Sequence, residues 1–145
     1  REELIFLQSY ISLMGLRFQD GLSFVTNISE EILDASILRF LLQPIIENAV
    51  QHGLLPSSKK PVINVDIEKC NEMLVIHIAD NGIGIPPPML EAIKKSLTEK
   101  EQLPTDHIGL KNVASRIRLA HGDAYGLSIE STQNVGTTVI MHLPI

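Results

Sequence analysis

Apolar side chains recur every three or four residues in three stretches of the chain, which is the period of one face of a helix. The stretches are residues 2–18, 37–53 and 108–121. Ser36 directly precedes the second stretch, where serine is a favourable N-cap. Gly53 and Gly122 stand at the ends of the second and third, where glycine commonly stops a helix. The sequence therefore predicts three amphipathic helices.

Pro44 lies inside the second of these stretches. Proline has no amide proton and its ring crowds the preceding turn, so the interior of a helix tolerates it poorly. We therefore expect the helix to kink at Pro44 or to begin again there.

Apolar and polar residues alternate in five shorter stretches, as they do in strands with one buried face. They are residues 22–28, 62–68, 73–79, 126–131 and 137–143. Short links join the second to the third and the fourth to the fifth, so each pair is predicted to form a hairpin. This order predicts an α+β fold, a two-layer α/β sandwich in which helices cover one face of a mixed sheet of about five strands.

Residues 82–107 follow neither period. They contain two glycines and three consecutive prolines, followed by a mainly polar run. An irregular segment of roughly 20 residues is uncommon in a compact domain and is usually functional. We expect a lid over a site at about residues 85–108, with a short helix over 88–97.

Composition limits the classes of partner and site. A chain of 145 residues with 44% hydrophobic content is the right size for one domain. Its net charge is −5 and its 12 basic residues are spread along the chain, so a nucleic acid is not an expected partner. Cys70 is the single cysteine, which excludes an internal disulfide and fits a reducing compartment. No apolar run reaches the roughly 18 residues that span a bilayer.

The end of the second predicted helix holds three side chains suited to a metal nucleotide. Glu47, Asn48 and His52 provide a carboxylate, an amide and an imidazole, and residues 48 and 52 are four apart and share a face. An amide oxygen is a hard ligand of the kind that Mg²⁺ accepts. The alternative is an ordinary solvated helix face.

Asp80 follows directly on an apolar stretch and precedes Gly82 and Gly84. A carboxylate held at a strand end can accept a hydrogen bond from the exocyclic amine of a purine, while glycines let a ligand approach the backbone. The alternative is a plain turn, since Asp-Asn and Asn-Gly are common turn pairs. The second glycine and the long irregular segment after it favour a binding site.

The third predicted helix begins near Gly109 and Leu110, and free amides at a helix N-terminus attract phosphate. Arg116 lies about two turns further on, where it could reach a phosphate or remain a solvated surface residue. Thr137 begins the last strand and can place a hydroxyl beside Asp80 if the two strands are neighbours. No Walker or dinucleotide-binding glycine motif is present, so a phosphate site must be built differently.

Four segments occur together in the order of a known family. LLQPIIENAVQHG, IADNGIGIP, HIGLKNVASRIRLAHG and VGTTVIMHLP resemble the asparagine box, the two glycine boxes and the closing strand of the ATP-binding fold shared by histidine kinases, gyrase and heat-shock chaperones. Together with FLQSYISLMGLRF they look most like the LytS/YesM-like sensor kinases. The resemblance implies the Bergerat ATP-binding fold and covers the whole chain.

The resemblance also implies roles for residues at the phosphate end of a nucleotide. Asn48 would ligate Mg²⁺ and His52 would lie near the phosphates, while Gly109 and Leu110 would present amides to them. Glu47 would polarise the attacking nucleophile.

At the base end, the resemblance implies that Asp80 accepts the adenine amine and that Thr137 supports Asp80 through its hydroxyl or a water. Gly82 and Gly84 would let the base and the lid approach. Two departures from the family pattern, Pro44 and Gln51, leave the role of Glu47 open.

The resemblance implies a domain that binds Mg²⁺ and ATP and transfers the γ-phosphoryl group to a histidine on a separate dimerisation domain. Residues 1–20 would end a helical linker from that domain, and residues 21–145 would form the catalytic domain. It further implies a response regulator as downstream partner, dimerisation only in the full-length protein, and a cytoplasmic position in a membrane-anchored sensor. Two alternatives stay open: a degenerate module that binds only nucleotide or a partner, and a serine kinase or ATPase of the same fold.

Overall fold

The computed structural model describes residues 1–18, 21–98 and 108–145. Its longer helices are α1 (Glu2–Gly15), α2 (Leu42–Asn48), α3 (Pro87–Thr98) and α4 (Ile108–His121), and its short ones are the 3-10 helix η1 (Glu30–Ile32) and the π-helix η2 (Ala49–Leu54). The strands are β1 (Ser23–Ile28), β2 (Val62–Cys70), β3 (Met73–Asp80), β4 (Gly126–Thr132) and β5 (Gly136–Pro144).

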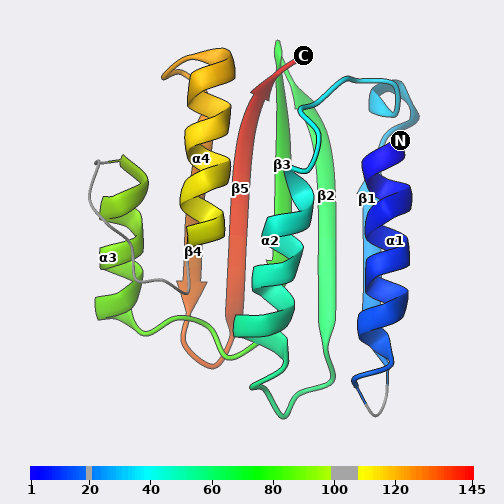
Figure 1. Cartoon of the computed structure of the whole chain (residues 1–145), viewed down its shortest axis with the longest axis vertical. Helices are drawn as coiled ribbons and strands as arrows, with labels where there is room; N and C mark the ends of the chain where they lie inside the picture. Colours follow the sequence, from blue (N-terminus) through cyan, green and yellow to red (C-terminus); the bar gives the residue numbers. More distant parts are fainter. Residues whose placement is uncertain (19–20, 99–107) are drawn as a thin grey trace.

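The strands form one sheet in the order β1-β2-β3-β5-β4. β1 and β2 are parallel, while the other three pairs of neighbours are antiparallel, including the two predicted hairpins. Helices α1, α2 and α4 lie over the same face of this sheet (Figure 1). The predicted two-layer sandwich with a mixed five-stranded sheet is therefore confirmed.

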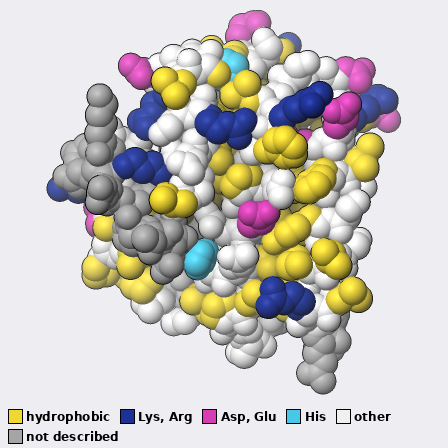
Figure 2. All heavy atoms as spheres, in the orientation of Figure 1, with side chains coloured by type: hydrophobic (Ala, Val, Ile, Leu, Met, Phe, Trp, Pro, Cys, Tyr) yellow, Lys and Arg dark blue, Asp and Glu magenta, His cyan; other side chains and the backbone are white. Residues whose placement is uncertain are grey.

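α1 lies at one side of the helical layer and is apolar on two faces. Its Leu7 and Ile11 are buried, whereas Ile5 and Leu13 are exposed. Hydrophobic side chains accordingly gather on the right of the space-filling view, over this helix (Figure 2). The helix ends at Gly15, three residues before the predicted end.

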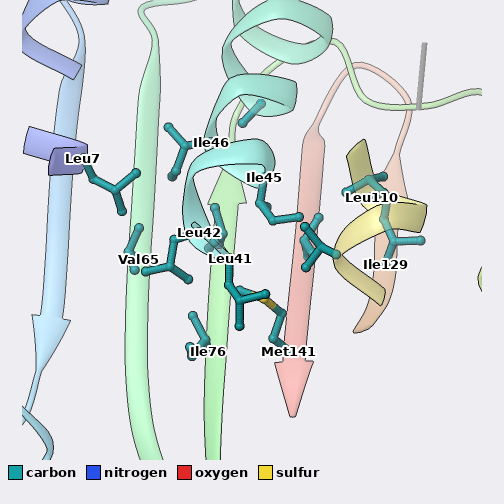
Figure 3. Packing of buried hydrophobic residues seen from close by; sticks show 14 of the residues in the cluster. Leu7, Leu41, Leu42, Ile45, Ile46, Val65, Ile76, Leu110, Ile129 and Met141 are labelled. Atoms are coloured by element: carbon teal, nitrogen blue, oxygen red, sulfur yellow. The ribbon is translucent and has the colours of Figure 1, made fainter. Parts of the chain in front are cut away.

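The core fills the space between the two layers. Leu7 and the side chains around α2 point toward the inward-facing residues of the sheet (Figure 3). Strand alternation supplies these inward residues, among them Val65, Ile76 and Met141, which are fully buried. Polar residues such as Asp66 and His77 take the alternate positions, and they pair across β2 and β3. The fold thus buries one face of the sheet, as the alternation predicts.

The second helix begins later than predicted. Ser36 does not stand at the start of the helix: α2 begins at Leu42 with Leu41 as its N-cap, and Phe40 lies in the left-handed region with φ 59°. The physical reason is Pro44, whose ring would collide with the carbonyl of residue 40 if that residue were helical. Pro44 therefore falls in the first turn of α2, where its missing amide proton is not needed. The restart that Pro44 predicted is confirmed, and Ser36 as the N-cap is wrong.

The region after β3 begins as predicted. The expected short helix over 88–97 is present as α3, which packs against β4 and α4. The rest of the expected lid includes residues 99–107, which lie outside the described residues. Among the described residues, no helix is both long and apolar enough to cross a membrane.

Candidate functional site

A small hollow of about 40 Å³ opens between the helical layer and the ends of β3 and β5. It is lined by Ile45, Asn48, Ala49, His52, Gly53, Ile78, Asp80, Gly84, Ile85, Leu110, Ile129, Thr137 and Val139. Six of these are among the residues predicted from the sequence, although they come from four separate parts of the chain. The others are mostly aliphatic, so the hollow is an apolar space with a few polar groups, as ligand sites usually are.

Asp80 provides the carboxylate of this hollow. It ends β3 directly opposite Thr137 of β5, so the two predicted residues are neighbours in the sheet. Burial raises the pKa of Asp80 to about 6, and hydrogen bonds from the backbone at Gly82 and Thr137 oppose that shift only in part. The Gly82 amide donates to Oδ1 at 2.8 Å. A buried carboxylate with an unused lone-pair direction is suited to accept a donor from a ligand.

Gly53 and Gly82 bring the π-helix and the end of β3 into direct backbone contact. A Cβ at Gly53 would lie 2.7 Å from Oδ1 of Asp80, and a Cβ at Gly82 would overlap the backbone of Gly53. The amide of Ile83 donates to the carbonyl of Gly53 at 3.0 Å. Sequence reasoning treated Gly53 only as a helix stop, since its contact with Asp80 links residues far apart in the chain. Its place in the ENAVQHG segment was the available signal.

Gly84 closes the hollow against the β4–β5 hairpin. It has φ +67°, and a side chain there would collide with the carbonyl of Thr132. The next amide, that of Ile85, donates to Oγ of Ser131 at 2.9 Å. Gly84 is therefore required both for its backbone conformation and for its close approach to the hairpin.

The hydroxyl of Thr137 is paired with a hydroxyl on the neighbouring strand β4. It lies 2.8 Å from Oγ of Ser131, which in turn donates to the carbonyl of Gly136 at 2.9 Å. Thr137 supports Asp80 through its backbone instead. The reason is strand geometry: Ser131 and Thr137 are cross-strand partners on the same face, which brings their hydroxyls together.

Asn48 lies at the other side of the hollow, on the last turn of α2. Its Nδ2 atom is buried and has no hydrogen-bond partner among the described residues. A buried polar group without a partner is costly, so this amide is suited to a ligand. Nδ2 can donate to a phosphate oxygen, and rotation of the amide would present Oδ1, a ligand that Mg²⁺ accepts. The residues present therefore fit a magnesium nucleotide.

The start of α4 lies beside Asn48. A Cβ at Gly109 would be 3.6 Å from Nδ2 of Asn48 and 3.7 Å from Cβ of Pro44. Leu110 is buried and lines the hollow. The start of α4 therefore lies at the same end of the site as Asn48, as the resemblance implied.

Glu47 and His52 lie on either side of Asn48 in the chain. His52 lines the hollow. Glu47 is not among the lining residues; its Oε1 accepts a hydrogen bond from Nε2 of Gln43 at 2.8 Å. Burial raises the pKa of Tyr10 of α1, and the nearby charge of Glu47 raises it further. Glu47 therefore faces α1 rather than the hollow.

The structure does not bring Arg116 to the hollow. Its guanidinium donates to the carbonyls of Arg39 at 2.6 Å and Phe40 at 3.2 Å, on the turn before α2. Arg116 lies about two turns after the start of α4. The helix therefore places Gly109 at the site and Arg116 beside the turn before α2.

The chain is similar to known proteins over nearly its whole length. A family described as histidine kinase-, DNA gyrase B-, and HSP90-like ATPase matches residues 33–145. The sensor histidine kinase YpdA of Escherichia coli is 33% identical over 144 residues, which are 99% of this chain and 24% of that protein. The sensor protein kinase HptS of Staphylococcus aureus is 31% identical over 99% of this chain and 27% of its own length. The chain thus spans about a quarter of these relatives.

Solved structures share the fold. The nucleotide-free catalytic domain of the histidine kinase ThkA superposes with a TM-score of 0.66 at 19% identity, covering 99% of this chain and 89% of that one. The histidine kinase domain of a blue-light-activated kinase from Erythrobacter litoralis gives 0.62 at 13% identity, over 97% and 59% of the two chains.

Proposed function

Because the chain belongs to the histidine kinase-, DNA gyrase B- and HSP90-like ATPase family, we propose that it binds magnesium ATP and transfers the γ-phosphoryl group to a histidine on a separate helical domain. The observation that carries this proposal is the pair of polar groups in the hollow: the buried carboxylate of Asp80 and the buried Nδ2 of Asn48, which has no hydrogen-bond partner among the residues that the structure describes. One suits the base of a nucleotide and the other suits its phosphates.

The adenine end of the site is Asp80 with the glycines around it. The carboxylate accepts the exocyclic amine, and the aliphatic walls Ile78 and Val139 cover the faces of the ring. Gly82 and Gly84 allow the backbone to lie close to the base. The hollow encloses only about 40 Å³, less than the few hundred Å³ typical of a ligand pocket, so binding requires the walls to separate.

The phosphate end is formed by α2, η2 and the start of α4. Asn48 holds Mg²⁺, and His52 with the amides of Gly109 and Leu110 bind the phosphate oxygens. The metal, when bound, neutralises charge that develops on the phosphates. Arg116 has no part in this proposal, because its guanidinium binds the turn before α2.

The transfer itself forms one bond and breaks one. A nitrogen of the acceptor imidazole attacks the γ-phosphorus, an N–P bond forms, the bond from the γ-phosphorus to the bridging oxygen breaks, and ADP leaves. Glu47 orients the imidazole through its other ring nitrogen and accepts the proton from it. Catalysis of this kind rests on positioning and charge stabilisation.

The rest of the full-length protein is proposed by analogy with the sensor kinases that the chain resembles. The acceptor histidine lies on a dimerisation domain to which α1 leads, and the phosphoryl group passes on to a response regulator. Residues 85–108 act as the lid. The chain forms the cytoplasmic part of a membrane-anchored sensor that dimerises only at full length.

The test is a titration of ATP into the chain with and without Mg²⁺, followed by addition of the helical acceptor domain. We expect Mg²⁺-dependent binding and an acid-labile, alkali-stable phosphate on the acceptor. Asn48→Asp should weaken Mg²⁺-dependent binding roughly 10-fold or more, because it adds a charge beside the phosphates. Asn71→Asp makes the same change at an exposed position in the turn between β2 and β3, at the opposite end of β3 from Asp80, and should bind like the wild type.

The outcomes separate the alternatives. Acid-stable phosphate on a serine would identify a serine kinase, and release of inorganic phosphate without transfer would identify an ATPase. Equal ATP binding with and without Mg²⁺, together with no effect of Asn48→Asp, would identify a degenerate binding module. Phosphate on the isolated chain would contradict an acceptor outside it.

A further inference from the structure

The turn before α2 is held by a carboxylate from α1. Glu3 accepts hydrogen bonds from the amide of Phe40 at 3.0 Å and from the amide of Leu42 at 2.5 Å, one on each of its oxygens. Phe40 has φ 59° and Leu41 has φ −79° and ψ −41°. A left-handed residue followed by a right-handed helical one turns successive amides to the same side and forms an anion-binding concavity. Glu3 is the anion in that concavity.

This contact replaces the cap that α2 lacks in its own sequence. The N-cap residue is Leu41, which has no side chain that can accept the free amides, and no side-chain cap bond is formed. Phe40 is also a bulky residue in a conformation that such residues avoid. The carboxylate of Glu3 supplies the missing acceptor at the positive end of α2 and stabilises the left-handed turn.

A second helix holds the same turn from the other side. Arg116 of α4 donates to the carbonyls of Arg39 and Phe40, so the peptide between these residues has an anion on its amide side and a cation on its carbonyl side. Phe6 of α1 adds an edge-to-face contact with Phe40, with ring centroids 6.3 Å apart. Three helices, α1, α2 and α4, therefore meet at one turn.

The turn is connected to the groups assigned to phosphoryl transfer through the side chain of Gln43. Gln43 follows the amide that Glu3 binds and donates to Glu47 at 2.8 Å. Asn48 is the residue after Glu47, and it lies beside Gly109 of α4. The position of α2 relative to α4 thus sets the distance between Asn48 and the amides opposite, where the phosphates would lie.

We propose that Glu3 is a positioning residue for phosphoryl transfer: it fixes the start of α2, and through α2 the placement of Glu47 and Asn48, only while α1 lies in its present place. This inference rests on the proposed function. A shift of α1 along its axis would remove both hydrogen bonds at once, since they share one side chain. The position of α1 therefore regulates transfer through Glu47 and Asn48, while Asp80 lies on β3 and keeps its backbone contacts with Gly82 and Thr137.

The test compares Glu3→Ala, Glu3→Gln and Glu2→Ala in the full-length kinase, with ATP KM and kcat of autophosphorylation as the readouts. Misplacement of catalytic groups by about 1 Å can lower a rate roughly 100-fold, so we expect Glu3→Ala to lower kcat roughly 10- to 100-fold. KM for ATP should rise by a smaller factor than kcat falls, because the contacts of Asp80 with the base remain and only those of Asn48 with the phosphates are disturbed. Glu3→Gln keeps the length and one acceptor oxygen and should lie between Glu3→Ala and the wild type. Glu2→Ala removes the same charge from the exposed neighbour and should behave as the wild type.

Hydrogen exchange in the same full-length variants gives a readout that does not depend on activity. The amides of residues 42, 43 and 45–48 should exchange faster in Glu3→Ala than in Glu2→Ala, with those of β3 unchanged. Equal kcat in Glu3→Ala and Glu2→Ala would overturn the inference, as would unchanged exchange in α2. A fall in kcat matched by an equal loss of ATP affinity and of folded protein would also overturn it, in favour of a purely structural role. A wild-type protein that binds ATP and never phosphorylates a histidine would instead refute the proposed function.

Discussion

Asp80 is an acidic residue in a buried environment, which disfavours its ionised form. Burial is the largest influence on its pKa and raises it to about 6, while the amide of Gly82 stabilises the ionised form. The carboxylate is thus ionised at neutral pH at a cost to folding stability. Groups with strongly shifted pKa values are concentrated at functional sites, so this shift supports Asp80 as a ligand contact.

Replacing this carboxylate should weaken nucleotide binding. Asp80→Asn keeps an oxygen for the Gly82 amide and loses the charge that strengthens the bond to the adenine amine. Hydrogen bonds to charged groups contribute about 1.5–3 kcal/mol, so affinity should fall roughly 10- to 100-fold, as measured by calorimetry with ATP. Asp66→Asn, the same change on β2 where Asp66 binds Asn27, is the control. Equal affinities in the two variants would contradict the assignment of Asp80.

The same substitution should change how stability depends on pH. An acid whose pKa is raised by folding binds more protons in the folded state, so stability falls as pH rises from its ordinary value of 3.8 to about 6. Asp80→Asn cannot ionise and should be more stable than the wild type at pH 7 by about 2–3 kcal/mol. The difference should vanish near pH 3, below both pKa values. Denaturant unfolding at both pH values measures it, and a variant less stable at pH 7 would show that Asp80 is stabilised there.

At the scale of elements, the site depends on how closely η2 approaches the end of β3. Gly53 is the contact point, because a side chain on it would reach the carboxylate of Asp80. The carboxylate is the mobile partner, so a side chain would displace it without breaking the backbone contact between Ile83 and Gly53.

Gly53→Ala should therefore lose binding before it loses folding. The methyl group displaces Oδ1, and we expect ATP affinity to fall roughly 10-fold or more with little change in melting temperature, since alanine is the better helix former. Gly126→Ala offers the control: a Cβ there meets no atom of the described residues within 4 Å. Calorimetry and thermal melting of both variants measure the two effects. Full ATP affinity in Gly53→Ala would mean that Asp80 does not contact the base.

At the scale of the whole molecule, α1 is part of the core. Leu7 is 0% exposed and belongs to the same hydrophobic cluster as residues of α2 and the sheet. The helix therefore adds burial to the domain even if it also leads to a second domain, and its displacement would expose part of the core.

Removing the buried side chain of α1 should destabilise the whole domain. Leu7→Ala should lower the free energy of unfolding by about 2–5 kcal/mol, the range for buried leucines. Leu13→Ala makes the same change on the same helix at a position that is 60% exposed and should stay within about 0.5 kcal/mol of the wild type. Urea unfolding measures both. Equal effects would indicate that α1 does not pack on the domain in solution.

Residue patterns predicted the strands, the hairpins and α4 almost to the residue, because alternation and helical period report which face of each element is buried. They also predicted the polar residues of the hollow, which follow directly on periodic segments. The start of α2 was mistaken, because apolar spacing from residue 37 continues through a stretch that Pro44 prevents from being helical. Arg116 was misplaced because its partners, the carbonyls of the turn before α2, are 76 and 77 residues away in the chain.

The sequence by itself determined the elements, their buried faces and the residue types available for a magnesium nucleotide, since these depend on local periodicity and side-chain chemistry. Only the tertiary structure decided which of those residues meet. The contact of Gly53 with Asp80, the approach of Gly109 to Nδ2 of Asn48, and the binding of Glu3 to the start of α2 all join distant segments. Such contacts depend on how the helices lie on the sheet, and no local pattern specifies that arrangement.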